Sequence, residues 1–272
     1  SARHPPEHHH HGGLTVPSTN SIPPHYIYSV RKLSKCYEQE RGYVLEIRNL
    51  DLRCGAMVAI TGPSGCGKST LLDILGLALR PDRGEHFLFR PHSDRAYDLL
   101  PLWREGQLDA MADLRLQYMG YVLQTGGLLP FLSVQDNMTL TARMTGMTSE
   151  EALDTARPLA ERLNIAHLYA AMPANLSVGE RQRVAIVRAL APHPRLILAD
   201  EPTAALDPVH AGHVMEIFLQ AVTDQRGTLV MVTHDAAFAR SGGLREIPFS
   251  IEKTPDGMCA ILDDREGPSC SA

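Results

Sequence analysis

The most informative run in this sequence is Gly62-Pro63-Ser64-Gly65-Cys66-Gly67-Lys68-Ser69-Thr70. It follows an apolar, strand-like run, Met57 to Thr61, and it precedes a helical run, Leu71 to Leu79. Glycines let successive backbone N–H groups turn towards an anion, while Lys68 and the dipole of the following helix add positive charge. In this setting the pattern G-x-x-x-x-G-K-[ST] predicts an α/β fold with a phosphate cradle for a nucleoside triphosphate and Mg²⁺.

A pair of acidic residues closes a second apolar run. Leu196 to Ala199 has the length and composition of a buried strand, and Pro202 stops it after Asp200 and Glu201. At the carboxyl end of such a strand, Asp200 can reach Mg²⁺ and Glu201 can poise a water for attack on the γ-phosphate. A solvated Asp-Glu turn is the alternative, which the phosphate cradle earlier in the chain disfavours.

Several classes of nucleotide-binding protein share a phosphate cradle, and a third motif distinguishes between them. A helical stretch that runs to about Ala191 opens with Leu176-Ser177-Val178-Gly179-Glu180-Arg181-Gln182. This run resembles the signature motif of ATP-binding-cassette (ABC) ATPases, LSGGQ in its commonest form, and lies where that family has it, shortly before the acidic strand. A serine hydroxyl, a glycine and a helix N-terminus form a second anion site, able to hold a γ-phosphate delivered by another subunit. A serine-capped helix alone would explain Ser177 but not its neighbours.

The resemblance extends over about residues 26 to 249 and implies further roles. Tyr37 is expected to stack on adenine, and Gln124 to meet Mg²⁺ and the attacking water. Asp207 belongs to the loop that communicates across a dimer, and His234 contacts the γ-phosphate. Each of these could singly be an ordinary packed or loop residue, but their order along the chain is the family's order. The Mg²⁺ ligands that the resemblance implies are Ser69, Gln124 and Asp200.

The same resemblance implies the organisation of the chain. We expect a P-loop NTPase fold, an ABC cassette with a parallel RecA-like core and an antiparallel β portion around residues 27–52. An α-helical subdomain is expected at about residues 125–190. Around the ATPase domain, residues 26–252, we expect a disordered His- and Pro-rich tail at 1–25 and a short C-terminal tail at 253–272. Residues 247–272 are expected to hold two short strands and a polar tail.

The signature run departs from its commonest form in two places. Val178 and Glu180 replace a glycine and the glutamine. An acid is favourable near a helix N-terminus, but Glu180 would also lie close to an incoming polyphosphate. We therefore expect slower turnover rather than lost activity.

Two segments around the expected helical lobe carry further local predictions. The stretch between Gly84 and Gln124 is longer than in small cassettes, and its runs Pro91 to Arg95 and Trp103 to Gly106 are typical of loops. We interpret residues 85–118 as a surface insertion. Ser133-x-x-Asp136 and Thr148-x-x-Glu151 are typical of capping boxes at helix starts. Pro158 is expected to kink or split the second of these helices.

Composition limits the function classes. The net charge of −5 argues against a broad nucleic-acid-binding surface, so no nucleic acid partner is expected. No run approaches the roughly 20 apolar residues that span a bilayer, and no secretory leader is visible, so membrane insertion is expected to belong to another chain.

The cysteines show no paired spacing and are expected to be reduced thiols, with Cys66 a small filler of the phosphate loop. The histidines before residue 25 could capture a metal, although a cloning remnant or solvated tail is the simpler interpretation.

The function expected from these features is an ATPase that dimerises on ATP and powers a membrane complex in transport, lipoprotein extraction or mechanical transmission. Integral membrane subunits would dock near Thr125 to Asn137, holding the homodimer at the cytoplasmic face of the cell membrane. Leu128-Leu129-Pro130 after the glutamine resembles the ATPases of lipoprotein-releasing and macrolide-exporter systems. Two alternatives are a soluble ABC clamp on a macromolecular partner and a non-hydrolysing regulatory module. Glu201 and His234 argue against the second.

Overall fold

The computed structural model describes residues 25–37, 42–204, 206, 208–255 and 257–264. The predicted tail before residue 25 and the predicted nucleotide contact Asp207 lie outside these residues. The strands are β1 (Tyr26–Tyr37), β2 (Tyr43–Arg53), β3 (Met57–Thr61), β4 (His86–His92), β5 (Arg95–Asp98), β6 (Met119–Val122), β7 (Leu196–Asp200), β8 (Thr228–Thr233), β9 (Arg245–Thr254) and β10 (Gly257–Asp263). The α-helices are α1 (Lys68–Leu75), α2 (Leu99–Arg104), α3 (Leu108–Tyr118), α4 (Val134–Met144), α5 (Ser149–Arg162), α6 (Val178–Leu190), α7 (Pro208–Asp224) and α8 (Ala236–Ser241), with short 3₁₀ turns η2 (Ala166–Leu168) and η3 (Pro173–Asn175).

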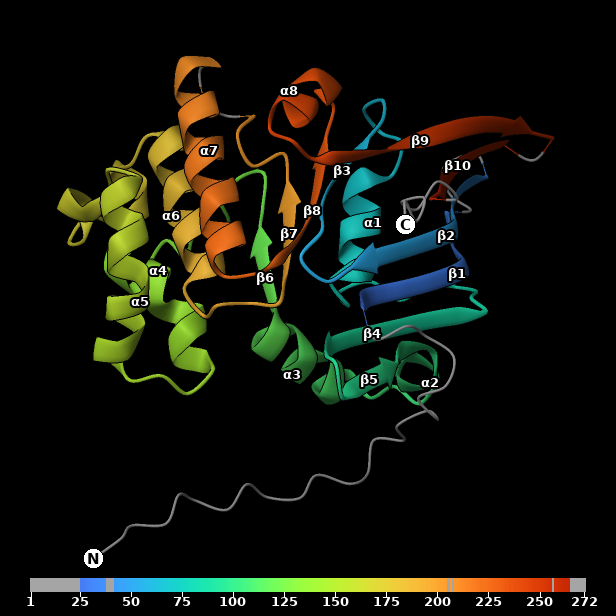
Figure 1. The fold of residues 1–272 in the computed structure, drawn as a ribbon, viewed down its shortest axis with the longest axis horizontal. Coiled ribbons are helices and arrows are strands. Elements are labelled where there is room, and N and C mark those ends of the chain that lie inside the picture. The colour runs from blue at the N-terminus through green and yellow to red at the C-terminus, as the bar shows by residue number, and fades with distance from the viewer. Residues whose placement is uncertain (1–24, 38–41, 205, 207, 256, 265–272) are drawn as a thin grey trace, which may run out of the picture.

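The described strands form one sheet in the order β5-β4-β1-β2-β10-β9-β3-β8-β7-β6. Its parallel half runs from β9 through β3, β8 and β7 to β6 (Figure 1). Every residue of β8 is buried because helices cover both faces. Val230 and Val232 belong to the core that includes α1, whereas Leu229 and Met231 belong to the core that includes α6 and α7. The parallel core expected from the sequence is therefore present.

The other half of the sheet is built from antiparallel pairs. β1 pairs with β2 and with β4, and β4 pairs with β5. Tyr28 anchors this half, because its fully buried ring lies 5.8 Å from the ring of Phe87 and 5.0 Å from that of Phe89. The antiparallel β portion predicted around residues 27–52 is confirmed.

The sheet continues beyond the predicted domain boundary at residue 252. β10 lies parallel to β2 and antiparallel to β9, so it joins the two halves. Ala260, Ile261 and Leu262 are at most 1% exposed. β9 and β10 are the two short strands predicted within residues 247–272. The predicted domain boundary at residue 252 falls inside β9 and leaves out β10, which is long enough to form a strand between two others.

Residues 85–118 are not a surface insertion of loops, and that interpretation is wrong. They form β4, β5, α2 and α3. Trp103 is only 7% exposed, and Met111 is fully buried in the same core as α1. The predicted loop around Pro91 to Arg95 is the tight turn from β4 to β5. Apolar side chains on both helices hold the segment against the sheet.

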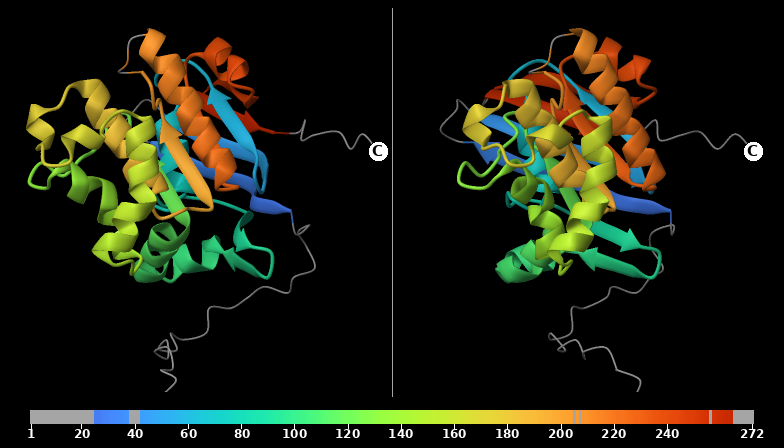
Figure 2. Two further views of the ribbon diagram at one scale, coloured as in Figure 1. Left: turned by 60° about the vertical axis from the view of Figure 1, so that its left-hand side comes forward. Right: turned by 90° about the vertical axis from the view of Figure 1, so that its left-hand side faces the viewer.

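The helical lobe consists of α4, α5 and α6, which gather beside β6 (Figures 1 and 2). Ser133 and Thr148 cap α4 and α5 as predicted. α5 runs from Ser149 to Arg162 without a break, so the split predicted at Pro158 does not occur. Pro158 is exposed, where water can take the freed carbonyl, while Ala156 and Ala160 on the opposite face are fully buried.

Among the described helices, none combines the length and the apolar content that crossing a membrane demands.

Candidate nucleotide-binding site

The phosphate loop connects β3 to α1. Gly65 and Gly67 have φ angles of 77° and 86°, which side chains with a Cβ rarely adopt. Lys68, the first residue of α1, is 7% exposed and donates from Nζ to the carbonyl oxygens of Gly62 and Pro63 at 2.9 and 2.8 Å. The ammonium group is thus held inside the loop, where phosphate oxygens are stronger acceptors than neutral carbonyls.

Two tyrosines form one wall of the cavity beside this loop. The rings of Tyr37 and Tyr43 lie 6.4 Å apart and are tilted by 46°. Tyr37 Oη lies 3.5 Å from Thr70 Oγ1, and a Cβ at position 67 would come within 2.9 Å of Tyr43 Oη. Both rings line the cavity, so either offers a flat face to a nucleobase. Tyr43 was missed by the sequence reasoning, although it lies opposite Tyr37 in the β1–β2 pair.

An oxygen-rich corner lies at the other end of the cavity. Ser69 Oγ donates to Asp200 Oδ2 at 2.8 Å. Burial raises the pKa of Asp200, the Ser69 hydrogen bond opposes this rise, and the charges of Glu201 and Asp73 add to it. Gln124 lines the same cavity. A half-buried carboxylate, a hydroxyl and an amide oxygen are the hard ligands that Mg²⁺ prefers, so these residues fit the metal.

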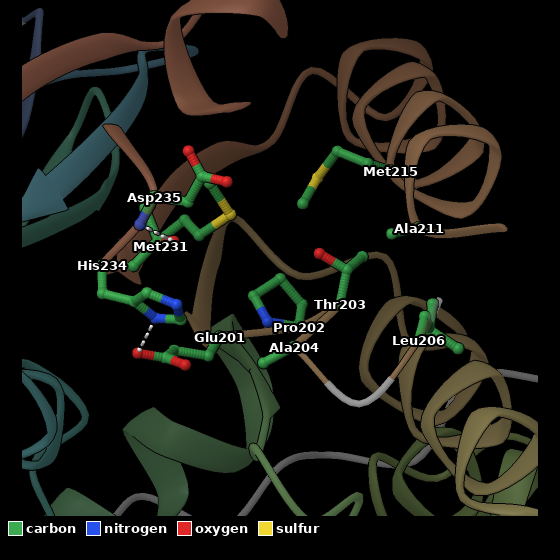
Figure 3. Close-up of a pocket in the computed structure, with 11 residues that line it drawn as sticks. Glu201, Pro202, Thr203, Ala204, Leu206, Ala211, Met215, Met231, His234 and Asp235 are labelled. Atoms are coloured by element: carbon green, nitrogen blue, oxygen red, sulfur yellow. Dashed lines mark hydrogen bonds and ion pairs between the residues drawn. The ribbon is translucent and has the colours of Figure 1, made fainter. Parts of the chain in front are cut away.

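Glu201 and His234 face one another at the carboxyl ends of β7 and β8. Glu201 Oε1 lies 2.9 Å from His234 Nδ1 (Figure 3). Glu201 has a φ of 44°, a strained conformation that costs about 1–3 kcal/mol and occurs mostly at functional sites. Its backbone N–H donates to the Val232 carbonyl at 3.0 Å, which fixes this turn against β8.

The carboxylate of Glu201 borders two cavities. One, of about 520 Å³, contains the phosphate loop. The other, of about 240 Å³, lies towards Met215 and Met231 (Figure 3). The larger cavity brings together most of the predicted site residues, namely Tyr37, Ser64, Gly65, Gly67, Lys68, Ser69, Thr70, Gln124, Asp200, Glu201 and His234. Cys66 is buried in the loop beneath it, where burial raises the pKa of its thiol.

The signature run lies outside the phosphate-loop cavity. Ser177 caps α6: its Oγ accepts from the Glu180 N–H at 3.2 Å and donates to Glu180 Oε2 at 2.7 Å. The Ser177 N–H also donates to Glu180 Oε2 at 2.7 Å. These hydrogen bonds lower the pKa of Glu180, so the carboxylate stays ionised. None of Ser177, Gly179 and Glu180 lines the cavity that holds Lys68.

The signature helix is tied to the segment that follows Gln124. Gln182 donates from Nε2 to the Leu123 carbonyl at 3.2 Å. The buried guanidinium of Arg188 donates to the carbonyls of Gly126 and Gly127, each at 2.8 Å. Sequence reasoning missed Arg188, because its partners lie about sixty residues away and no local pattern indicates them. The two segments are therefore expected to move together.

Comparisons with known proteins agree with this geometry. A model of the ABC transporter family matches residues 45–204. The lipoprotein-releasing system ATP-binding protein LolD of Rickettsia bellii is 35% identical over 78% of this chain and 90% of its own length. LolD 2 of Caulobacter vibrioides is 38% identical over 79% of this chain and 90% of its own length. The ATP-binding protein HrtA of Staphylococcus saprophyticus is 38% identical over 71% of this chain and 82% of its own length. Its name refers to hemin import.

Solved structures show the same architecture. The dimeric ATP-binding cassette MJ0796, bound to ADP and Pi in a post-hydrolysis state, has a TM-score of 0.68 and 32% identity, covering 81% of this chain and 93% of that one. CbiO1 of Clostridium perfringens, part of the ABC transporter complex CbiONQ, has a TM-score of 0.67 and 25% identity, covering 88% and 87%. The predicted cassette fold is confirmed. The chain belongs to the ABC transporter family and is an ATP-binding cassette with ATPase activity.

Proposed function

We propose that two copies of this ATPase close on ATP so that each copy completes the other's site. The observation that carries the proposal is a separation within the chain: Lys68, Asp200 and Glu201 line one cavity, whereas Ser177 caps a helix outside it. Both places present groups suited to phosphate. A cassette of the same fold is dimeric with ADP and Pi, which supports the arrangement.

In this proposal different residues of the cavity bind the phosphates, hold the metal and accept the proton. Lys68 exchanges loop carbonyls for phosphate oxygens, and Ser69, Gln124 and Asp200 would hold Mg²⁺. When bound, the metal neutralises charge on the phosphates. Glu201 accepts a proton from the water whose oxygen attacks the γ-phosphorus, and the bond from that phosphorus to the bridging oxygen breaks as ADP leaves. His234 keeps the Glu201 carboxylate in position through its Nδ1 contact.

Integral membrane subunits are proposed to dock on the segment that follows Gln124. Phe131 is 72% exposed at the centre of this segment. The turn that presents it is rigid, because the buried Asn137 side chain donates to the carbonyls of Leu129, Leu132 and Ser133 and accepts from the Leu129 N–H. A large exposed ring on a rigid turn is suited to a partner's apolar groove.

Such docking would place the chain at the cytoplasmic face of a membrane, held there by its partner. The names of the relatives support a membrane system: LolD is named for lipoprotein release, and CbiO1 is part of a transporter complex. HrtA is named for hemin, so relatives of similar identity carry different cargo names. The proposal therefore concerns the ATP-driven clamp and its membrane docking, and it names no cargo.

The variant Glu201→Gln tests the clamp. Without the base, ATP turnover should fall by about 10²- to 10⁴-fold, and the ATP-bound dimer should persist long enough to be weighed by light scattering during gel filtration. The matched control is His213→Gln, an exposed change on α7 away from the described cavity. A Glu201→Gln protein that stays monomeric with ATP and Mg²⁺ and hydrolyses ATP at the wild-type rate would refute the proposal.

A further inference from the structure

A second polar cavity, of about 550 Å³, lies at the opposite end of the parallel strands from the phosphate loop. Arg195 directly precedes β7, and Arg226 and Thr228 lie at the start of β8. Asp200 and His234, at the other ends of these strands, belong to the nucleotide cavity. A strand rises about 3.3 Å per residue, so the length of β7 alone separates the two cavities by roughly 13–16 Å.

The wall of this cavity is strongly basic although the chain has a net charge of −5. Arg53, Arg195 and Arg226 line it together with His25 and His92. No carboxylate among the described residues lines it, and none of these three arginines forms an ion pair with a described carboxylate. Exposed arginines that converge on a hollow without acidic partners create a positive potential there.

Hydrogen bonds between distant segments hold the frame of the cavity. The Cys54 N–H donates to the His25 carbonyl at 2.8 Å, and the Gly55 N–H donates to Thr228 Oγ1 at 2.9 Å. The Thr228 N–H in turn donates to the Arg195 carbonyl at 2.9 Å. The backbone positions that carry the arginines are therefore fixed before any ligand arrives, which lowers the entropic cost of binding.

A buried guanidinium next to the cavity adds a further observation. Arg90 in β4 is 6% exposed, and it donates to the Ser93 carbonyl at 3.1 Å. Its buried Nε finds no hydrogen-bond partner among the described residues. Ser93 lines the cavity, so this positive charge lies directly behind the wall. A buried cation without an acid is costly, and an anion in the cavity would offset that cost.

We propose that this cavity binds a small phosphate-bearing ligand, a phosphomonoester or a diphosphate, independently of ATP. Guanidinium groups match phosphate oxygens because each presents paired N–H donors in a plane. The cavity is concave and about as large as the nucleotide cavity, which fits a small molecule better than an extended polymer. Ile27 and Pro91 supply an apolar side for the carbon part of such a ligand.

The test uses calorimetric titration of the full chain with pyrophosphate while ADP and Mg²⁺ saturate the phosphate loop. We expect one saturable pyrophosphate site per chain. The double variant Arg195→Gln, Arg226→Gln should weaken it about 10- to 100-fold, because two charge-assisted contacts are lost. The matched control is Arg80→Gln, Arg104→Gln, which removes two exposed arginines outside the cavity and should leave the affinity unchanged. ADP binding and the melting temperature should be the same in all three proteins, which separates this site from the ATPase site.

A second arm distinguishes a free ligand from a lipid headgroup. Vesicles of phosphatidylcholine and phosphatidic acid in equal amounts are sedimented with each protein, because the headgroup of phosphatidic acid is a phosphomonoester. If the wild type sediments with the vesicles, the Arg195, Arg226 double variant does not, and pyrophosphate releases the wild type, the cavity binds a headgroup phosphate. If the wild type binds pyrophosphate but does not sediment with the vesicles, the cavity binds a free ligand. Pyrophosphate binding that is absent, or equal in the wild type and the double variant, would overturn the proposal. So would binding of a short oligonucleotide that needs both arginines when pyrophosphate does not bind.

Discussion

The helices α5 and α6 begin with the same local chemistry but have different surroundings. At α5, the Thr148 N–H donates to Glu151 at 2.7 Å and Thr148 Oγ1 accepts at 3.2 Å. At α6, Ser177 and Glu180 repeat both distances. The differences lie around the caps: α5 carries two acids in its first turn, whereas α6 carries one acid and a glycine. Capping alone therefore does not indicate an anion site.

The surroundings of α6 favour a ligand more than those of α5. A Cβ at Gly179 would lie 2.7 Å from the end of the Leu206 side chain, so the start of the helix lies close to the loop after Glu201. Ser177 Oγ also donates to Glu180, and this O–H could donate to a phosphate oxygen instead. The same carboxylate repels that phosphate. The start of α6 thus resembles an anion site in which the Glu180 carboxylate competes with the phosphate for the same donors.

The largest effect is expected from a change in the site that α6 is proposed to complete. Lys68→Ala deletes the ammonium group that the loop holds, and one or two charge-assisted contacts to phosphate disappear with it. ATP affinity of the monomer should fall about 10- to 100-fold, measured by equilibrium titration with a fluorescent ATP analogue. Ser177→Ala, in contrast, should leave monomer affinity unchanged. Normal ATP binding by the Lys68 variant would contradict the assignment of the whole site.

The next prediction separates the two caps directly. Ser177→Ala and Thr148→Ala each remove an N-cap hydroxyl, so each should lower the free energy of unfolding by about 1 kcal/mol. Only Ser177→Ala should lower ATP turnover, by about tenfold or more, since only Ser177 is proposed to contact a partner's γ-phosphate. Urea unfolding and steady-state ATPase assays measure the two quantities. Equal turnover losses in both variants would show that Ser177 acts only as a cap.

A smaller effect is expected from the capping acids. Glu180→Gln keeps a side chain that can cap the helix but removes the charge beside the incoming phosphate. ATP-dependent dimerisation, measured in the Glu201→Gln background, should tighten about three- to tenfold. Glu151→Gln, its counterpart on α5, should leave dimerisation unchanged. Weaker dimerisation after Glu180→Gln would contradict the competitor role.

The smallest effect concerns pH. Hydrogen bonds from Ser177 lower the pKa of Glu180, and hydrogen bonds from Thr148 lower that of Glu151. Each carboxylate therefore adds stability above its ordinary pKa, and that stability is lost as pH falls through the lowered value. Thermal unfolding between pH 6 and about pH 3 should show a shallower acid loss in the Glu151→Gln, Glu180→Gln double variant than in the wild type. An identical acid loss would show that neither bond persists in solution.

Short motifs allowed much of the site to be predicted from the sequence. Within the phosphate loop, and within the acidic pair at the end of β7, the residues are neighbours in the chain, so local patterns predict them. The structure puts Lys68, Asp200 and Glu201 around one cavity. The cap at Ser133 and the capping box at Thr148 and Glu151 were predictable for the same reason, because a cap involves residues only three apart.

Contacts between distant segments could not be predicted in this way. Tyr43 reaches the cavity through strand pairing across a hairpin, and Arg188 reaches Gly126 and Gly127 from another element. Residues 85–118 looked like an insertion because the stretch is long and contains two runs typical of loops. Its apolar side chains, such as Trp103, become core only when packed on the sheet. Two short strands were predicted near the C-terminus, but the short apolar run of β10 does not reveal which strands it joins.

The most direct test of the central claim is the crystal structure of the Glu201→Gln variant with ATP and Mg²⁺. We predict that Ser177 Oγ and the Gly179 N–H of one copy lie within hydrogen-bond distance of the γ-phosphate that Lys68 of the other copy holds. The Ser177–Glu180 side-chain bond should then be broken. A structure with ATP in the phosphate loop and residues 177–179 far from every γ-phosphate oxygen, in all assemblies of the crystal, would contradict the account.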